Sequence, residues 1–219
     1  MEPDRNVRLQ PWVRGRALQA DPREIPAASG GKARLRRRDD DELRFGGGFC
    51  SYEQGTQLDA AAAFLEEHGE EVAYVTIDIG GNDLLSGGVP AIAANLPVIL
   101  NTLQDVAAPN VQIVAMNYYD PFVAPVWFGT QSLAALQSEV ASIAAFNDFL
   151  ESIYAMFGVD VADVEAAFSL TDLTIQLSGL PLNVQRACEW TWMCSVSDIH
   201  ANSEGYAVIA RAFAEELAP

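Results

Sequence analysis

The sequence is poor in basic residues, and the few it has lie near one end. It holds 13 Lys and Arg residues against 30 Asp and Glu, which gives a formal net charge of −17. After Arg44 the only basic residues are Arg186 and Arg211. Phosphate groups are bound by clustered Lys and Arg, so this balance argues against a nucleic-acid partner. The change in charge near residue 45 indicates a boundary between a short first segment and a longer acidic one.

Other absences narrow the class of protein further. No apolar run is long enough to cross a bilayer, so we predict no integral membrane segment, and no signal peptide is visible at the N-terminus. The chain has two histidines and three cysteines without metal-ligand spacing, and it lacks a dinucleotide or Walker fingerprint. We therefore expect neither a metal nor a cofactor.

The three cysteines are Cys50, Cys188 and Cys194, and an odd number leaves at least one thiol unpaired within the chain. Cys188 and Cys194 bracket the short aromatic stretch "EWTWM", which a disulfide would close into a loop if the protein is exported. The alternative is a pair of buried thiols.

Strand and helix patterns alternate through most of the chain. This predicts an α/β fold of three layers, α/β/α, with a parallel sheet covered on both faces, as in flavodoxin-like proteins. Residues 1–45 lack apolar periodicity and contain several Pro and Gly breakers, so we expect them to be poorly ordered and residues 46–219 to form the domain. The expected elements are helices over 57–71, 92–107, 132–158 and 203–217, strands over 72–79, 111–117 and 159–168, and a loop over 118–125.

The stretch "VTIDIGGNDLL" places Asn82 just beyond the end of a buried strand, after two glycines that permit a sharp turn. A carboxamide at this position can point into the crevice above a parallel sheet, where an oxyanion donor is required. The alternative is a turn followed by an Asn or Asp helix cap.

The stretch "SDIHANSEGYAVIA" places His200 in a polar loop before the last helix, with Asp198 two residues earlier. A histidine oriented by a carboxylate is the usual general base beside a serine nucleophile. The alternative is a loop histidine that makes a local cap contact. His68, the other histidine, lies at a predicted helix end, and we interpret it as a surface residue near the terminal carbonyls.

Together, "GGND" after a strand and "DIHAN…GY" before the last helix resemble two sequence blocks of the SGNH (GDSL-type) hydrolases. The segments "GGGFCSYEQGTQLDAAAAFL", "MNYYDPF" and "ACEWTWMC" are similar to a bacterial, typically exported branch of these esterases and lipases. The resemblance implies a serine-type ester hydrolase, extracellular and monomeric, acting on a small-molecule ester. It assigns the oxyanion donor to Asn82 and the base to His200. The family acid commonly stands three residues before the His, where this chain has Ser197, so either Asp198 or a backbone carbonyl would orient His200.

Two family blocks are missing from residues 1–45. No Gly-Asp-Ser occurs in the chain, so we expect the first strand to be absent or disordered, and "RRDDDEL" stands where the family has a "GETT"-like stretch. Codons permitted for Arg34 to Leu43, read one nucleotide further on, give Gly-Cys-Ala-Gly-Glu-Thr-Thr-Thr-Ser-Phe. Our hypothesis is that residues 1–44 are an out-of-frame translation. The alternatives are a solvated charged linker and a functional charge patch.

A chain made as written would lack its recognisable nucleophile. Ser29, Ser51 and Ser86 are conceivable substitutes, and none has the context that the role requires. The sequence therefore leaves three hypotheses open: an esterase or lipase with a damaged N-terminus, a catalytically inactive member that binds an acyl or glycan ligand, and a non-functional fragment.

Overall fold

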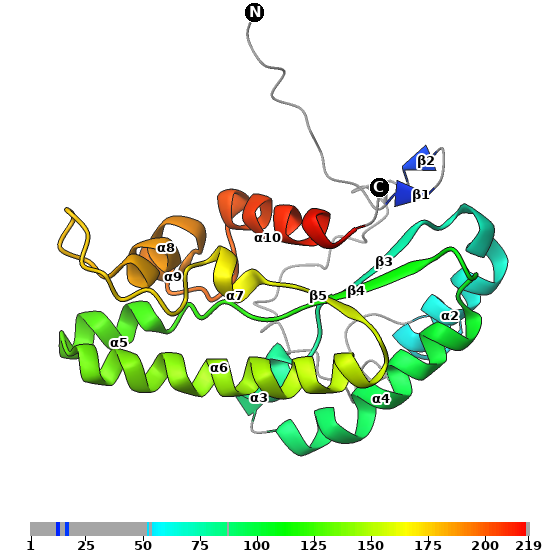
Figure 1. Ribbon diagram of the computed structural model, residues 1–219, viewed down its shortest axis with the longest axis horizontal. Helices are drawn as coiled ribbons and strands as arrows, with labels where there is room; N and C mark the ends of the chain where they lie inside the picture. Colours follow the sequence, from blue (N-terminus) through cyan, green and yellow to red (C-terminus); the bar gives the residue numbers. More distant parts are fainter. Residues whose placement is uncertain (1–11, 14–15, 18–51, 53, 87, 218–219) are drawn as a thin grey trace, which may run out of the picture.

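The computed structural model describes residues 12–13, 16–17, 52, 54–86 and 88–217 (Figure 1). Within the first 45 residues it describes only a pair of two-residue strands, β1 (Trp12–Val13) and β2 (Arg16–Ala17), which pair antiparallel. The other predictions for the start of the chain fall on residues that the structure does not describe. They concern the disorder of residues 1–45, the missing first strand, Cys50 and the stretch read in the shifted frame.

A parallel sheet forms the centre of the domain. Its strands are β3 (Tyr74–Ile77), β4 (Gln112–Met116) and β5 (Asp160–Ala162), in the order β3-β4-β5. Ile77 lies opposite Ala115, and Met116 lies opposite Ala162, so the three carboxyl ends meet at one edge of the sheet. The parallel α/β/α prediction is confirmed.

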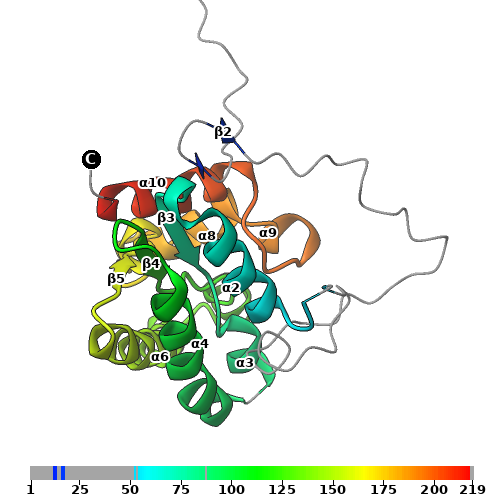
Figure 2. The same ribbon diagram turned by 90° about the vertical axis from the view of Figure 1, so that its right-hand side faces the viewer.

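Helices cover both faces of this sheet, as Figures 1 and 2 show. Alternate residues of β4 supply the two faces, because successive side chains on a strand point in opposite directions. Ile113 and Ala115 pack into a core built largely from α4 (Val89–Val106) and α6 (Leu133–Met156). Val114 and Met116 pack against α10 (Ser203–Glu216) on the other face. A further helix, α2 (Gln57–His68), packs on α4 and buries Leu58 and Leu65.

Most predicted elements are present with shifted ends, and two expectations are wrong. The predicted strand over 159–168 ends at Ala162, because Asp163 caps the short helix α7 (Val164–Ala167) through its carboxylate. The predicted loop over 118–125 contains the start of α5 (Val123–Thr130). The aromatic stretch between the cysteines is divided between α8 (Leu182–Trp190) and α9 (Met193–Val196).

The remaining short elements connect these units. The predicted helix over 57–71 tightens at its end into a 3-10 turn, η1 (Gly69–Glu71), and α3 (Gly81–Ser86) follows β3. A third apolar cluster joins α5, α6 and α8 beyond the end of the sheet. None of the helices in the described part of the chain combines the length and apolar character needed to span a bilayer.

Candidate active site

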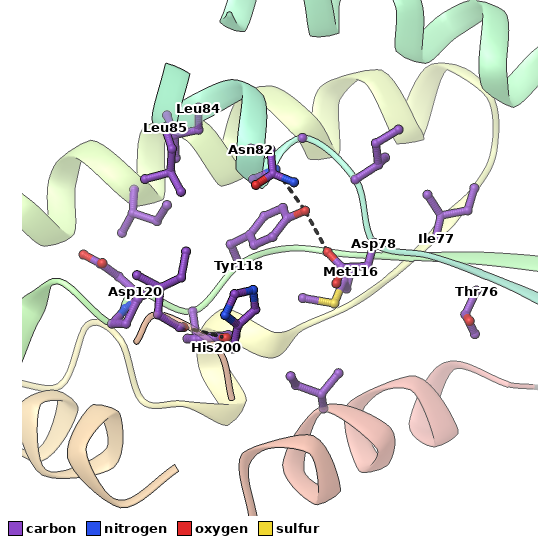
Figure 3. Close-up of a pocket in the computed structure, with 18 of the residues that line it drawn as sticks. Thr76, Ile77, Asp78, Asn82, Leu84, Leu85, Met116, Tyr118, Asp120 and His200 are labelled. Carbon is purple, nitrogen blue, oxygen red and sulfur yellow. Dashed lines mark hydrogen bonds between the residues drawn. The ribbon is translucent and has the colours of Figure 1, made fainter. Parts of the chain in front are cut away.

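A cavity of about 780 Å³ opens at the carboxyl end of the sheet and continues along β3. Among the described residues β3 pairs only with β4, and Val75, Thr76 and Ile77 of this strand line the cavity. Thr76 is exposed. Figure 3 shows Asn82, Tyr118, Asp120 and His200 around this space. The cavity therefore lies where a parallel sheet of this kind usually binds its ligand.

The turn after β3 depends on two glycines. Gly80 has φ of +106°, in the left-handed region that glycine adopts without strain. A Cβ on Gly81 would lie 3.0 Å from the ring atom Cε1 of Tyr118. This close approach places Asn82 in the first turn of α3, where it lines the cavity. Asn82 is a helical residue, one position beyond the start of α3.

Tyr118 connects this turn to the end of β3. Its hydroxyl donates a hydrogen bond to Asp78 Oδ1 at 2.7 Å and accepts one from the Gly81 N–H at 3.1 Å. Solvent reaches Asp78 through the cavity, yet the surrounding protein removes enough water to raise the pKa of this carboxyl, against a lowering contribution from the Tyr118 hydrogen bond. Burial also raises the pKa of Tyr118, so its hydroxyl stays a proton donor.

Asp120 is a buried carboxyl at the end of β4. It is 5 % exposed, and its Oδ1 accepts a hydrogen bond from the Phe122 N–H at 2.7 Å. Its Oδ2 makes no hydrogen bond with any residue that the structure describes. Burial raises the pKa of Asp120 to about 7, although the Phe122 hydrogen bond acts in the opposite direction. Asp120 is therefore partly protonated near neutral pH.

His200 and Asp198 form a direct pair on the opposite wall of the cavity. His200 Nδ1 lies 2.6 Å from Asp198 Oδ1, and the same oxygen accepts the His200 backbone N–H at 2.8 Å. Of the two groups expected to orient His200, the Asp198 carboxylate is therefore in contact with the imidazole. Both side chains are well exposed, at 65 % and 49 %. The backbone and side-chain hydrogen bonds from His200 hold the pKa of Asp198 below its usual value, so this carboxylate stays ionised.

The backbone around His200 is fixed by the segment between α8 and α9. The His200 carbonyl accepts the Trp192 N–H at 3.0 Å, and Thr191 and Ala201 form an antiparallel bridge. The predicted disulfide between Cys188 and Cys194 is present and encloses Trp192. It spans the residues that hold the His200 loop.

Asn202 and Gly205 complete this attachment. The Asn202 carboxamide donates to the Glu189 carbonyl at 2.8 Å, and its oxygen caps α10 by accepting the N–H groups of Glu204 and Gly205. A Cβ on Gly205 would lie 2.0 Å from the Trp190 carbonyl oxygen, so α10 approaches α8 at a distance that only glycine permits. The glycine of the "GY" pair is thus a packing requirement.

The other candidate residues are His68 and three serines. His68 is the last residue of α2, near Glu67 and the Phe64 ring, outside the cavity lining. Ser86 is the last residue of α3, and Ser29 and Ser51 fall outside the described residues. Ser142 is the serine among the described residues that line the cavity, and its hydroxyl donates to the Ser138 carbonyl at 3.0 Å, within α6.

Asp78, Tyr118 and Asp120 were not among the site residues predicted from the sequence. All three follow or end a buried strand, which is the same signal that singled out Asn82. Applying that rule to both strands would have found them. No three His, Cys, Asp or Glu side chains in the described ranges gather as a metal-ligand set.

A comparison with protein families matches residues 16–208 to the GDSL-like Lipase/Acylhydrolase family. No curated protein matches the chain. Because the match covers most of the sequence, the chain belongs to this hydrolase family, as the two sequence blocks predicted. The match begins at residue 16, inside the segment of residues 1–45 that the charge distribution sets apart.

Proposed function

We propose that this domain hydrolyses carboxylic esters and that His200 is its general base. The observation that carries the proposal is the 2.6 Å contact between His200 Nδ1 and Asp198 Oδ1, at a cavity that Asn82 also lines. An ionised carboxylate only accepts hydrogen bonds, so Nδ1 carries a proton, and in the neutral imidazole Nε2 then holds the free lone pair. An imidazole in this tautomer can take a proton from a hydroxyl group.

In the proposed reaction a serine hydroxyl gives its proton to His200 Nε2 while its oxygen attacks the ester carbonyl carbon. The Asn82 carboxamide donates a hydrogen bond to the carbonyl oxygen as that oxygen becomes negative. The tetrahedral intermediate collapses, the bond to the alcohol breaks, and the proton passes from His200 to the leaving alcohol. Water then repeats these steps on the acyl-enzyme, which releases the acid and restores the serine.

The serine in this proposal comes from outside the described residues. A further parallel strand on the open edge of β3 would end at the same sheet edge as the Asn82 turn. In the family that the sequence resembles, the first strand lies within the sheet and leads into Gly-Asp-Ser. Residues 1–44 contain no such motif, so a frameshift remains our hypothesis for their origin. For the chain as written we expect only weak residual turnover, because loss of the serine costs several orders of magnitude in kcat.

A second candidate function is binding without turnover, in a catalytically inactive member that takes an acyl or glycan ligand. The missing Gly-Asp-Ser favours it, and a non-functional fragment is the third hypothesis. We further propose that the protein is exported and monomeric. The disulfide supports export, because disulfides persist in oxidising compartments.

Hydrolysis of p-nitrophenyl butyrate tests the proposed function. The assay compares the chain as written with the product of the same gene after a one-nucleotide shift of codons 1–44. We expect the shifted product to be faster by several orders of magnitude and to lose that gain with His200→Ala. His68→Ala is the matched control, because it removes the other histidine, outside the cavity lining.

Three outcomes would contradict parts of this proposal. Turnover that survives His200→Ala would remove His200 as the base. A shifted frame without a "GETT"-like peptide would end the frameshift hypothesis, and ligand-induced thermal stabilisation without turnover would favour the binding function.

A further inference from the structure

We propose that Asp78 accepts a hydrogen bond from a hydroxyl group of the ligand and so selects esters of polyols or sugars over simple alkyl esters. This inference depends on the proposed function in one respect, namely that the bound ester is a substrate. It concerns the binding step, which can be measured in a chain that does not turn over.

Asp78 is held in place on one side and open on the other. Its Oδ1 accepts the Tyr118 hydroxyl at 2.7 Å, and that hydroxyl is itself fixed by the Gly81 N–H. The carboxyl lies directly beyond β3 and is exposed within the cavity. In Figure 3, Asp78 lies on the far side of the Tyr118 ring from Leu84 and Leu85. A carboxylate fixed in this way is preorganised to bind a hydrogen-bond donor in the cavity.

The titratable groups around Asp78 that the structure describes are mostly acidic, and His200, whose electrostatic interaction lowers the pKa of Asp78, is engaged with Asp198. No Lys or Arg is found among the described residues that line the cavity, which does include the carboxyls of Asp120 and Glu139. Asp78 forms no ion pair within the described part of the chain. An anionic ligand group would be repelled at this position, and a neutral or cationic donor would be favoured.

The tyrosine rings favour a hydroxyl over a cation. Cations are bound over open aromatic faces, as in choline sites. The Tyr118 ring packs against Gly81 and lies 5.9 Å from the Phe146 ring, centroid to centroid. The Tyr119 ring is stacked on Phe168 at 4.4 Å. Two of the three tyrosine rings that line the cavity are therefore engaged in packing. The third, Tyr206 on α10, is exposed, and a single open ring offers a cation less than an aromatic cage would.

A hydroxyl also suits both protonation states of Asp78. Burial raises the pKa of this carboxyl, so its protonated fraction is larger than that of an ordinary aspartate at the same pH. A hydroxyl donates to the ionised form and accepts from the protonated form. A cation satisfies only the ionised form, and an ester or ether oxygen only the protonated one.

Calorimetric binding of matched esters tests this inference, with His200→Ala as the background so that turnover does not interfere. Glyceryl monobutyrate and n-propyl butyrate share the acyl group and a three-carbon alcohol, and they differ by two hydroxyls. We expect the glyceryl ester to bind at least about tenfold more tightly, since a hydrogen bond to a charged group contributes about 1.5–3 kcal/mol. Asp78→Asn should remove most of this preference.

Two further variants separate the hydrogen bond from charge and from folding. Asp105→Asn makes the same change at an exposed carboxyl of α4, outside the cavity lining, and should leave the preference unchanged. Tyr118→Phe keeps Asp78 but removes the hydroxyl that orients it, and should reduce the preference to an intermediate value. Circular dichroism of each variant confirms that the fold is retained.

Equal binding of the two esters, binding of neither, or a preference that survives Asp78→Asn would overturn the inference. Butyrylcholine could instead bind more tightly than the glyceryl ester and lose this advantage in Asp78→Asn. That result would mean that Asp78 binds a cation, and it would also overturn the inference. Hydrolysis of p-nitrophenyl butyrate without any hydroxyl preference would leave the proposed function standing. The expected preference for the glyceryl ester, in a protein that hydrolyses no ester, would support this inference and contradict the proposed function.

Discussion

The two walls of the cavity hold their carboxyl groups in opposite ways. On the His200 wall, residues 188–206, the Asp198 carboxylate is exposed and stays ionised because His200 donates hydrogen bonds to it. On the Tyr118 wall, formed by Asp78, Gly81, Tyr118 and Asp120, burial raises the pKa of both carboxyls. The same residue type is thus held in its charged form on one wall and shifted toward its neutral form on the other, which suits two different roles in one site.

The walls also differ in what positions them. The His200 wall depends on backbone contacts, among them the Trp192–His200 hydrogen bond, the Cys188–Cys194 disulfide and the close approach at Gly205. The Tyr118 wall depends on side chains packed at the ends of β3 and β4. Backbone changes should therefore damage the first wall, and changes of pH should act on the second.

Gly205→Ala should have the largest effect. Its Cβ would lie 2.0 Å from the Trp190 carbonyl oxygen, so α10 and α8 must separate. We expect a loss of about 4 kcal/mol or more in the free energy of unfolding, and a melting temperature lower by roughly 10 °C. Thermal unfolding followed by circular dichroism measures both.

The matched control is Gly129→Ala in α5. An added Cβ there meets no atom within 4 Å, and alanine is favoured over glycine in a helix by about 1 kcal/mol. A Gly205→Ala protein as stable as the Gly129→Ala protein would show that the His200 wall tolerates the separation.

Asp120→Asn should change how stability depends on pH. The folded protein keeps the Asp120 proton until pH about 7, while an unfolded chain releases it near the ordinary pKa of 3.8. The folded state therefore binds more protons between these values, and the wild-type free energy of unfolding should fall from pH 4 to pH 7 and then level off. The pKa difference corresponds to about 4 kcal/mol at most. An unpartnered amide in the variant costs about 1 kcal/mol, so we expect a net gain of roughly 3 kcal/mol above pH 7.

Urea unfolding of both proteins from pH 4 to pH 8 measures this difference. Asp172 is the matched control, because its Oδ1 accepts the Thr174 N–H in the same local turn at 2.9 Å, on the surface. That hydrogen bond lowers the pKa of Asp172, so its contribution has the opposite sign, with stability rising as the pH rises through the acid range. A pH profile that Asp120→Asn leaves unchanged would mean that Asp120 is ordinarily ionised.

The difference between the His200 wall and the Tyr118 wall also explains which features the sequence predicted. The helices α6 and α10 and the strand β4 follow from apolar periodicity, which is a local property. The His200–Asp198 pair was also predictable, since the two residues are neighbours in sequence. The catalytic roles of His200, Asp198 and Asn82 remain predictions.

The side-chain contacts of the Tyr118 wall could not be predicted from local patterns, although Asp78, Tyr118 and Asp120 each lie near the end of a predicted strand. Tyr118 reaches Asp78 across about 40 positions of sequence, and only the parallel pairing of β3 with β4 brings them together. The start of α5 inside an expected loop follows from the buried turn of Asp120, and the early end of β5 from the cap at Asp163. In each of these cases one polar side chain overrides the periodicity around it.

Removal of the disulfide by a Cys188→Ser, Cys194→Ser double variant should have the smallest effect on global stability. The bridge joins residues six apart, and closing so short a loop is worth about 2 kcal/mol in the chain-entropy account. The local effect should be larger than the global one, because the bridge encloses Trp192, which binds the His200 carbonyl. Amide hydrogen exchange at Trp192 and Asn202 should accelerate by more than the change in global stability accounts for, while exchange in β4 should follow global stability alone. Equal acceleration in both places would mean that the His200 wall is positioned by α10 and the sheet, and that the disulfide only adds stability.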